Sequence, residues 1–267
     1  MLFFTRYLAL SAIALTSVSG APFEDSADAK APRQGWGGGG GGRPGGYNQA
    51  NRGFAGGILL RIEPLGASIT HGVASNDGNG YRKRLRDATV YTGNQVDMVG
   101  NNPNGTMVNN QNSGWPGLVI DEVHDKSNTD TPEFKPNLVL INAGTNDAIQ
   151  NIDIGNAGNR MNNLINDIYS QSSHATIILS GLLVNADSGT NSRAQQINAQ
   201  YQSLVSSLQI AGAPIIWADM QGSDGPTLAD ISSDGTHPVD SGYKKMANIW
   251  YGAIAAADVK GYLQSAE

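Results

Sequence analysis

The chain has 267 residues, of which 23 are acidic and 17 basic, and it contains no cysteine. This length accommodates one sizeable α/β domain with tails, and the net charge of -6 disfavours a nucleic-acid-binding protein, because phosphate recognition needs clustered Lys and Arg. Without cysteine there is no disulfide, no thiolate nucleophile and no cysteine-ligated zinc, so covalent catalysis would fall to Ser, Thr, Lys or a carboxylate.

The first 21 residues have the pattern of a secretory signal peptide. Arg6 precedes an apolar run over 7–15, and small residues follow up to Ala21. The run is too short to cross about 30 Å of hydrocarbon, and no later segment reaches about 18 consecutive apolar residues. We therefore predict a secreted, extracellular protein with a signal peptide at 1–21 and no membrane span.

Residues 22–57 are predicted to form a flexible linker. The segment contains three prolines, the glycine run 37–42 and almost no large aliphatic side chain. Such a segment cannot bury enough apolar surface to offset its ordering entropy. Two aromatic residues, Trp36 and Tyr47, leave a binding role for this segment open.

From residue 58 onward, short apolar runs alternate with helical patterns. The predicted strands are 58–62, 96–99, 138–142, 176–179 and 214–217. The predicted helices are 81–91, 117–126, 157–170, 192–211 and 241–257. Continuous apolar runs are typical of parallel strands buried on both faces, and the alternation implies right-handed crossovers. We therefore predict one domain over 58–267, an α/β fold in which a three-layer α/β/α sandwich surrounds a five-stranded parallel sheet.

The segment that follows the first predicted strand contains a candidate nucleophile. In parallel sheets, ligands bind outside the carboxyl ends of the strands, so polar residues there are candidates for chemistry. Gly66 permits a tight turn, and Ser68 can project its hydroxyl from it. Thr70 stands where the pattern G-x-S-x-G has its second glycine, which argues against the α/β-hydrolase fold. Taken alone, Ser68 could also be an ordinary turn or helix-capping serine.

Two further segments offer donors for an oxyanion. Residues 112–117, Asn-Ser-Gly-Trp-Pro-Gly, precede a predicted helix, where a glycine N–H and the helix N-terminus both favour an anion. We choose Gly117, adjacent to that helix, over Gly114. After the most apolar strand, Asn146 offers side-chain N–H donors, although an Asx turn is an alternative for it. Asp147 is expected to cap the turn that follows.

A loop near the C-terminus supplies an acid and a base. Asp234 and His237 lie three residues apart, with Gly235 between them and Pro238 after them. A carboxylate that accepts from one imidazole nitrogen fixes the tautomer and leaves the other nitrogen to take a serine proton. Alone, this motif could be a helix-capping loop. Combined with Ser68, it predicts a catalytic triad of Ser68, His237 and Asp234.

The remaining histidines have no comparable spacing. We expect surface or structural roles for His71, His124 and His174. No cluster of His or carboxylate residues has the spacing of metal ligands, and no phosphate loop is present. The sequence therefore predicts side-chain chemistry without a metal or a cofactor, in a protein that we expect to be a monomer.

These segments resemble, in order, the sequence blocks of SGNH (GDSL-type) hydrolases. The matches are Ser68 in block I, Gly117 in block II, Asn146 in block III, and Asp234 with His237 in block V. Ala67 replaces the aspartate that usually precedes the nucleophile. The resemblance spans about 59–257 and implies a flavodoxin-like SGNH hydrolase fold, a Ser68 nucleophile and an oxyanion hole that includes Gly117 and Asn146.

Within that family, the segments 60–72, 96–100 and 242–247 resemble carbohydrate esterase family 3. This resemblance implies deacetylation of acetylated xylan or a similar plant polysaccharide. The alternatives are a lipase-like or other acyl-ester hydrolase of the same fold and a non-catalytic cell-wall-binding protein.

The segment 101–115 bears on this choice. It is rich in Asn and Gly, which predicts an open polar rim suited to acylated carbohydrates or small esters, unless it is a disordered insertion. It also contains the glycosylation sequon Asn104-Gly105-Thr106, which is relevant if the host is eukaryotic.

Overall fold

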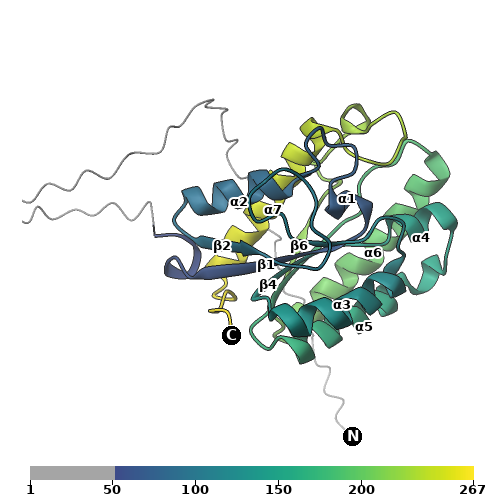
Figure 1. Ribbon diagram of the computed structural model, residues 1–267. Helices are drawn as coiled ribbons and strands as arrows, with labels where there is room; N and C mark the ends of the chain where they lie inside the picture. The colour runs from purple at the N-terminus through teal and green to yellow at the C-terminus, as the bar shows by residue number, and fades with distance from the viewer. Residues whose placement is uncertain (1–51) are drawn as a thin grey trace, which may run out of the picture.

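The computed structural model describes residues 52–267, and these form three layers (Figure 1). The central sheet has the strand order β2-β1-β4-β5-β6, and a two-residue strand, β3, also pairs with β1. The strands are β1 (Leu59–Gly66), β2 (Gln95–Met98), β3 (Ser113–Gly114), β4 (Leu138–Asn142), β5 (Thr176–Ser180) and β6 (Ile215–Ala218). All pairings within this sheet are parallel. The predicted α/β/α sandwich is confirmed, with β3 as an addition to the five predicted strands.

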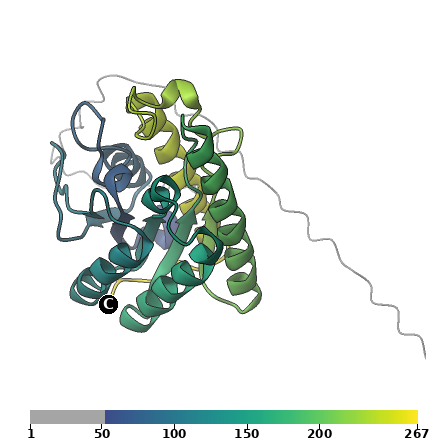
Figure 2. The same cartoon turned by 90° about the vertical axis from the view of Figure 1, so that its right-hand side faces the viewer.

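Helices cover both faces of the sheet, as the two views in Figures 1 and 2 show. The helices are α1 (Ser68–His71), α2 (Arg82–Tyr91), α3 (Ile120–Phe134), α4 (Thr145–Gln150), α5 (Ala157–Gln171), α6 (Ser188–Ile210) and α7 (Asp240–Val259). Within residues 52–267, the short 3-10 helices are η2 (Phe54–Gly56), η3 (Ile154–Asn156) and η4 (Leu228–Asp230). The helices α2 and α7 pack on one face, and α3, α5 and α6 pack on the other.

The central strand β4 explains why the sheet has two cores. All five of its residues are buried. Leu138 and Leu140 face the core under α2 and α7, whereas Val139 and Ile141 face the core under α3, α5 and α6. Because side chains alternate along a strand, a continuous apolar run supplies both faces at once.

The strand β1 is longer than predicted and ends at Gly66. It pairs with β2 up to Ile62 and with β3 from Leu65 onward. Pro64 lies at this change of partner, where its missing N–H removes no bond to β2 or β3. This extension places the end of β1 directly before Ser68.

The helix α3 begins three residues later than predicted and continues well beyond residue 126. Gly117 has φ +88°, which is not helical, so the helix cannot begin there. The second half of α3 buries polar residues, among them Ser127, Asp130 and Thr131. Because these residues interrupt the apolar pattern, the second half of α3 could not be predicted from the sequence.

The last residues of the predicted linker, 52–57, contact the domain instead of being flexible. Phe54 is buried, and its ring lies 5.2 Å from that of Tyr251. Its backbone N–H donates to Asn94 Oδ1 at 2.7 Å. Residues 52–57 therefore pack on the domain, so the boundary of the packed domain lies before residue 58. The rest of the linker and the predicted signal peptide lie outside the described residues.

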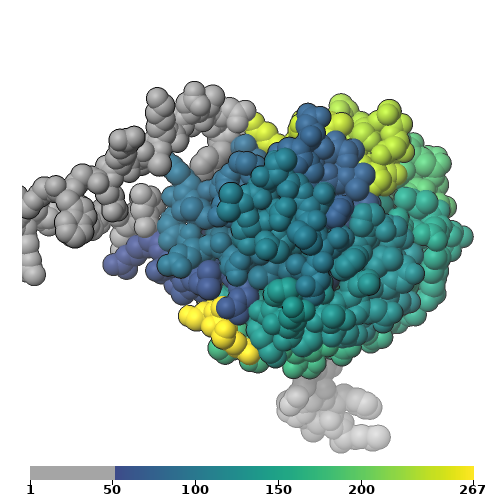
Figure 3. Space-filling model, viewed as in Figure 1, coloured from purple at the N-terminus to yellow at the C-terminus, as the bar shows by residue number. Residues whose placement is uncertain are grey.

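The segment 101–115 is fixed to the domain by a buried arginine rather than inserted loosely. The Arg82 guanidinium donates to the backbone carbonyl oxygens of His71, Gly78, Asn104 and Asn110. The Asn104 amide donates to the carbonyls of His71 at 2.8 Å and Gly78 at 3.1 Å, so a glycan on Asn104 would displace internal bonds. In Figure 3, the dark blue to teal colours that include the segment 101–115 fill the centre of the face in view.

Candidate active site

Ser68 begins α1, immediately past the carboxyl end of β1. The turn before it is tight because Gly66 touches the neighbouring strand. A Cβ on Gly66 would lie 2.2 Å from the carbonyl oxygen of Asn142 on β4 and 2.6 Å from Thr70 Oγ1. A glycine is required there, since any side chain would push β1 away from β4. The half-buried Ser68 is therefore held where the ligand crevice of a parallel sheet lies.

The predicted triad is assembled in hydrogen-bonding geometry. Ser68 Oγ lies 2.8 Å from His237 Nε2, and His237 Nδ1 lies 2.7 Å from Asp234 Oδ2. The residues at the two ends of this chain of bonds are far apart in sequence, so the fold brings them together. With Asp234 accepting from Nδ1–H, the Nε2 lone pair points to the serine hydroxyl, which is the arrangement that activates a serine.

Backbone groups keep the Asp234 carboxylate charged. Its Oδ1 accepts from the N–H groups of Thr236 at 2.8 Å and His237 at 2.9 Å. Burial opposes the charged form, but these two bonds, together with those from the His237 and Ser232 side chains, lower the pKa of Asp234 below its ordinary value. The carboxylate is therefore ionised at neutral pH, as its role beside an imidazolium requires.

The loop 232–238 is closed on itself and tied to the segment after β5. Within it, Ser232 N–H donates to the His237 carbonyl at 2.8 Å. From outside, Ala186 N–H donates to the Gly235 carbonyl at 2.9 Å, and Asn185 Nδ2 donates to Thr236 Oγ1 at 3.0 Å. We call residues 232–238 the acid–base loop.

Asn146 lies on α4, which follows β4, the strand beside β1. Its Nδ2 donates one bond, to the Leu118 carbonyl at 2.8 Å, and keeps a second N–H. The Ser68 backbone N–H belongs to the first turn of α1, where no intrahelical acceptor exists. Both groups therefore follow the carboxyl ends of adjacent strands, and the role of Asn146 as an oxyanion donor remains a prediction.

The structure distinguishes the two candidate glycines. Gly117 lies in an exposed turn closed by the bond from Leu118 N–H to the Trp115 carbonyl, and its φ of +88° accounts for the glycine. The reason for choosing it was wrong, because α3 begins only at Ile120. Gly114 is the glycine that touches the nucleophile's helix, since a Cβ there would lie 2.5 Å from the backbone N of His71.

Asp147 does not cap the turn after it. It is buried and accepts from the backbone N–H of Ile120, the first residue of α3, at 3.1 Å. Its other oxygen lies 2.7 Å from the Arg160 guanidinium. Burial raises the pKa of Asp147 and Arg160 opposes this rise. Asp147 therefore links α4 to the first residue of α3 and, through Arg160, to α5.

The other histidines make contacts outside the triad. His124 Nε2 lies 2.7 Å from Asp167 Oδ2, and His174 Nδ1 lies 2.8 Å from the Ser265 carbonyl. His71 is on α1, close to Ser68, and burial and the nearby Arg82 lower its pKa. The burial of Arg82 could not be predicted from the sequence, because Arg82 lies among three other basic residues of the same helix.

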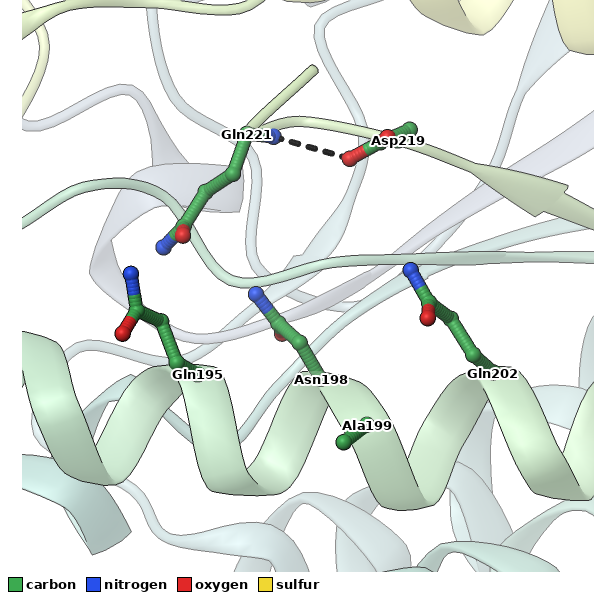
Figure 4. A pocket seen from close by; sticks show the side chains of 6 residues that line it. All are labelled: Gln195, Asn198, Ala199, Gln202, Asp219 and Gln221. Carbon is green, nitrogen blue, oxygen red and sulfur yellow. Dashed lines mark hydrogen bonds between the residues drawn. The ribbon is translucent and has the colours of Figure 1, made fainter.

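A hollow of about 260 Å³ lies between α6 and the loop after β6. Figure 4 shows amide side chains from α6 facing this loop, where Asp219 accepts from the backbone N–H of Gln221. Its lining residues are Gln195, Asn198, Ala199, Gln202, Asp219 and Gln221. None of them is a serine, histidine or lysine, so the covalent chemistry remains with Ser68. Over residues 52–267, no group of three or more His, Cys, Asp or Glu could hold a metal ion.

Three comparisons with known proteins, by family, by sequence and by structure, give consistent results. A multidomain esterase of Ruminococcus flavefaciens is 26% identical over 238 residues, which cover 78% of this chain and 29% of that protein. The chain thus spans less than a third of that relative. A family 3 carbohydrate esterase of Clostridium thermocellum is 24% identical with a TM-score of 0.68, covering 76% of this chain and 98% of that one. One from Talaromyces cellulolyticus is 18% identical with a TM-score of 0.63, covering 75% and 99%.

At these identities the two solved structures support the fold. The family model described as "GDSL-like Lipase/Acylhydrolase family" matches residues 65–245, a range that contains Ser68, Asn146 and both residues of the acid–base pair. The chemistry named in that description, hydrolysis of acyl esters, agrees with the predicted carboxylic ester hydrolase. Because the match covers more than half of the chain, the chain belongs to the GDSL-like lipase/acylhydrolase family, which confirms its resemblance to SGNH hydrolases.

Proposed function

We propose that the chain is a secreted serine esterase that removes short acyl groups, acetyl above all, from a plant cell-wall polysaccharide such as acetylated xylan. The ester chemistry rests on one observation, the continuous chain of hydrogen bonds from Ser68 Oγ through His237 to Asp234. Family membership supports the same reaction type.

The first half of the reaction acylates Ser68. His237 Nε2 takes the proton of Ser68 Oγ as that oxygen bonds to the acyl carbon, and Asp234 stabilises the imidazolium that results. Negative charge develops on the former carbonyl oxygen. The Ser68 N–H and the free N–H of Asn146 can donate hydrogen bonds to that oxygen. The Nε2 proton then passes to the alcohol oxygen as the ester bond breaks. The alcohol leaves with that proton, and the acyl group stays on Ser68.

The second half returns the enzyme to its starting state. A water molecule gives a proton to His237 Nε2 as its oxygen attacks the acyl carbon. The tetrahedral intermediate collapses with release of the carboxylic acid, and Ser68 Oγ recovers the proton from His237. Water supplies the proton that Ser68 recovers, and Ser68, His237 and Asp234 end the cycle in their starting states.

Three features support a short acyl group on a carbohydrate. The segment 101–115 near α1 is polar and well tied down, which suits a hydrated substrate better than a fatty-acyl chain. Two of the similar structures are named family 3 carbohydrate esterases. The sequence pattern of the N-terminal 21 residues, which lie outside the described residues, supports secretion. Within 52–267, no helix is long and apolar enough to cross a membrane.

The test is hydrolysis of aryl esters of increasing acyl length beside release of acetate from acetylated xylan. We expect the acetyl ester to be the fastest and acetate to be released. Faster hydrolysis of octanoyl esters without acetate release would favour the lipase-like alternative. Binding of the polysaccharide without any turnover would favour a non-catalytic cell-wall-binding protein.

A further inference from the structure

Glu63 is an ionisable group inside the sheet that the proposed mechanism does not use. It lies on β1, five residues before Ser68, and none of its surface is exposed. A carboxyl group in such a place is unfavourable unless hydrogen bonds compensate for the loss of water. Its presence in a central strand therefore needs an explanation other than packing.

Two buried hydroxyl groups donate to Glu63. Ser113 Oγ on β3 donates to Oε1 at 2.9 Å, and Thr131 Oγ1 on α3 donates to Oε2 at 2.9 Å. An ionised carboxylate only accepts, so two donors fit its charged form better than its neutral form. Glu63 thus links β1 to β3 through one carboxylate oxygen and to α3 through the other.

Of these two elements, β3 is the shorter, and its Gly114 also accepts from Asn102 Nδ2 at 2.6 Å and donates its N–H to Asn112 Oδ1 at 2.9 Å. This strand has two residues, and it pairs with β1 only through Leu65 and Gly66. Its second residue, Gly114, touches α1, since an added Cβ would lie 2.5 Å from His71 N and 2.9 Å from the Thr70 carbonyl carbon. A shift of β3 would therefore displace α1, the helix that carries the nucleophile.

We propose that Glu63 is a positioning residue whose carboxylate, by holding Ser113, keeps β3 packed against α1 and so keeps Ser68 in line with His237. This inference rests on the proposed ester hydrolysis at Ser68. Glu63 itself touches neither substrate nor the triad.

The charge of Glu63 makes this role depend on pH. Burial raises the pKa of Glu63 to about 7, the Ser113 and Thr131 bonds oppose the rise, and Asp130 on α3 adds to it. The strands β3 and β4 contribute no ionisable side chain to its surroundings. As the pH falls through about 7, Glu63 takes up a proton and becomes a weaker acceptor for Ser113.

Stability and activity should respond to Glu63 with opposite signs. The pKa of Glu63 in the folded chain lies above its ordinary value of 4.5. Folding therefore favours the protonated form, and ionisation lowers the stability progressively as the pH rises from 4.5 to about 7. Glu63→Gln removes this penalty and should raise the melting temperature at about pH 8, while it lowers kcat. A residue kept only for stability would lower both.

The experiment measures kcat on a small acetyl ester for wild type and Glu63→Gln from about pH 5 to about pH 9. Steps that do not involve Glu63 are common to both proteins, so they cancel in the ratio of the two kcat values. We expect wild type to be roughly ten- to a hundredfold faster above pH 7, with the ratio approaching one at about pH 5. A ratio that does not change with pH, or a ratio of one throughout, would overturn the proposal.

A matched pair of variants separates the two hydrogen bonds. Ser113→Ala removes the bond to β3 and should lower kcat as Glu63→Gln does, whereas Thr131→Val removes the bond to α3 and should change kcat less than about twofold. Equal losses in both variants would contradict the proposal. An active Ser68→Ala variant would overturn the proposed function and this inference with it, while a flat kcat ratio beside an inactive Ser68→Ala variant would overturn this inference alone.

Discussion

The two halves of the triad are held in different ways. The Asp234 carboxylate accepts from backbone N–H groups two and three residues later, with the loop tied to the segment after β5 through Asn185 and Ala186, and the Asp234 side chain is 46% exposed. Ser68 is fixed instead by long-range packing, through Gly66 against β4 and β3 against α1. The acid–base pair can therefore form locally, whereas the nucleophile reaches its place only when the sheet is complete.

The largest loss is expected from the acid–base loop. His237→Ala should reduce kcat by about 10⁴-fold or more, because Ser68 loses the base that takes its proton. Asp234→Asn should cost less, since the amide can still orient the ring. Both variants should keep the wild-type melting temperature to within a few degrees, because their contacts are local. Steady-state kinetics and thermal unfolding check this, and a large fall in melting temperature would show that the loop supports the fold.

The loop's local character is why it could be identified from the sequence. The spacing of Asp234 and His237 and the turn at Gly235 allow the two side chains to meet within one loop, and Ser68 after the first strand favoured a catalytic role for the pair. The strand pattern likewise predicted the sheet, because apolar runs buried on both faces are unambiguous over five residues, as in β4. The surroundings of Ser68 were not predictable in this way, since a glycine needed for close approach looks like any turn glycine. The adjacency of Gly117 to the helix was wrong for that reason, and its role in the oxyanion hole stays a prediction.

The next largest effect is expected at Asn146. Asn146→Ala should lower kcat by roughly 10²- to 10³-fold with little change in KM, because an oxyanion donor acts mainly in the transition state. The bond to the Leu118 carbonyl is lost in the same variant. Asn146→Asp provides the matched comparison, as it keeps the size and removes the donors. A change confined to KM would assign Asn146 to substrate binding instead.

The packing around Ser68 should show a coupled loss of stability and activity. Gly66→Ala places a methyl group 2.2 Å from the Asn142 carbonyl oxygen, so β1 and β4 must separate. We expect a loss of about 2–3 kcal/mol in the free energy of unfolding, together with reduced kcat. Gly117→Ala is the control, since nothing lies within 4 Å of its added Cβ, although its positive φ carries a smaller strain. Denaturant unfolding that ranks the two variants in the reverse order would contradict this account.

The smallest effects concern the N-terminal side of the domain. Deleting residues 22–57 should lower the melting temperature by several degrees, because Phe54 and its bonds to Asn94 are lost. Deleting 22–51 should leave the melting temperature and small-ester activity unchanged, since that segment lacks core-forming residues. Calorimetry of both truncated proteins is the test, and equal melting temperatures would show that Phe54 contributes nothing.

The central claim is that Ser68 is the nucleophile, activated through His237 by Asp234. The most direct measurement is reaction with a serine-directed fluorophosphonate, followed by peptide mass spectrometry. The account predicts a single adduct on Ser68 in wild type, a much slower adduct in His237→Ala, and none in Ser68→Ala, whose loss of one oxygen leaves the fold intact. Undiminished labelling of the Ser68→Ala variant would contradict it.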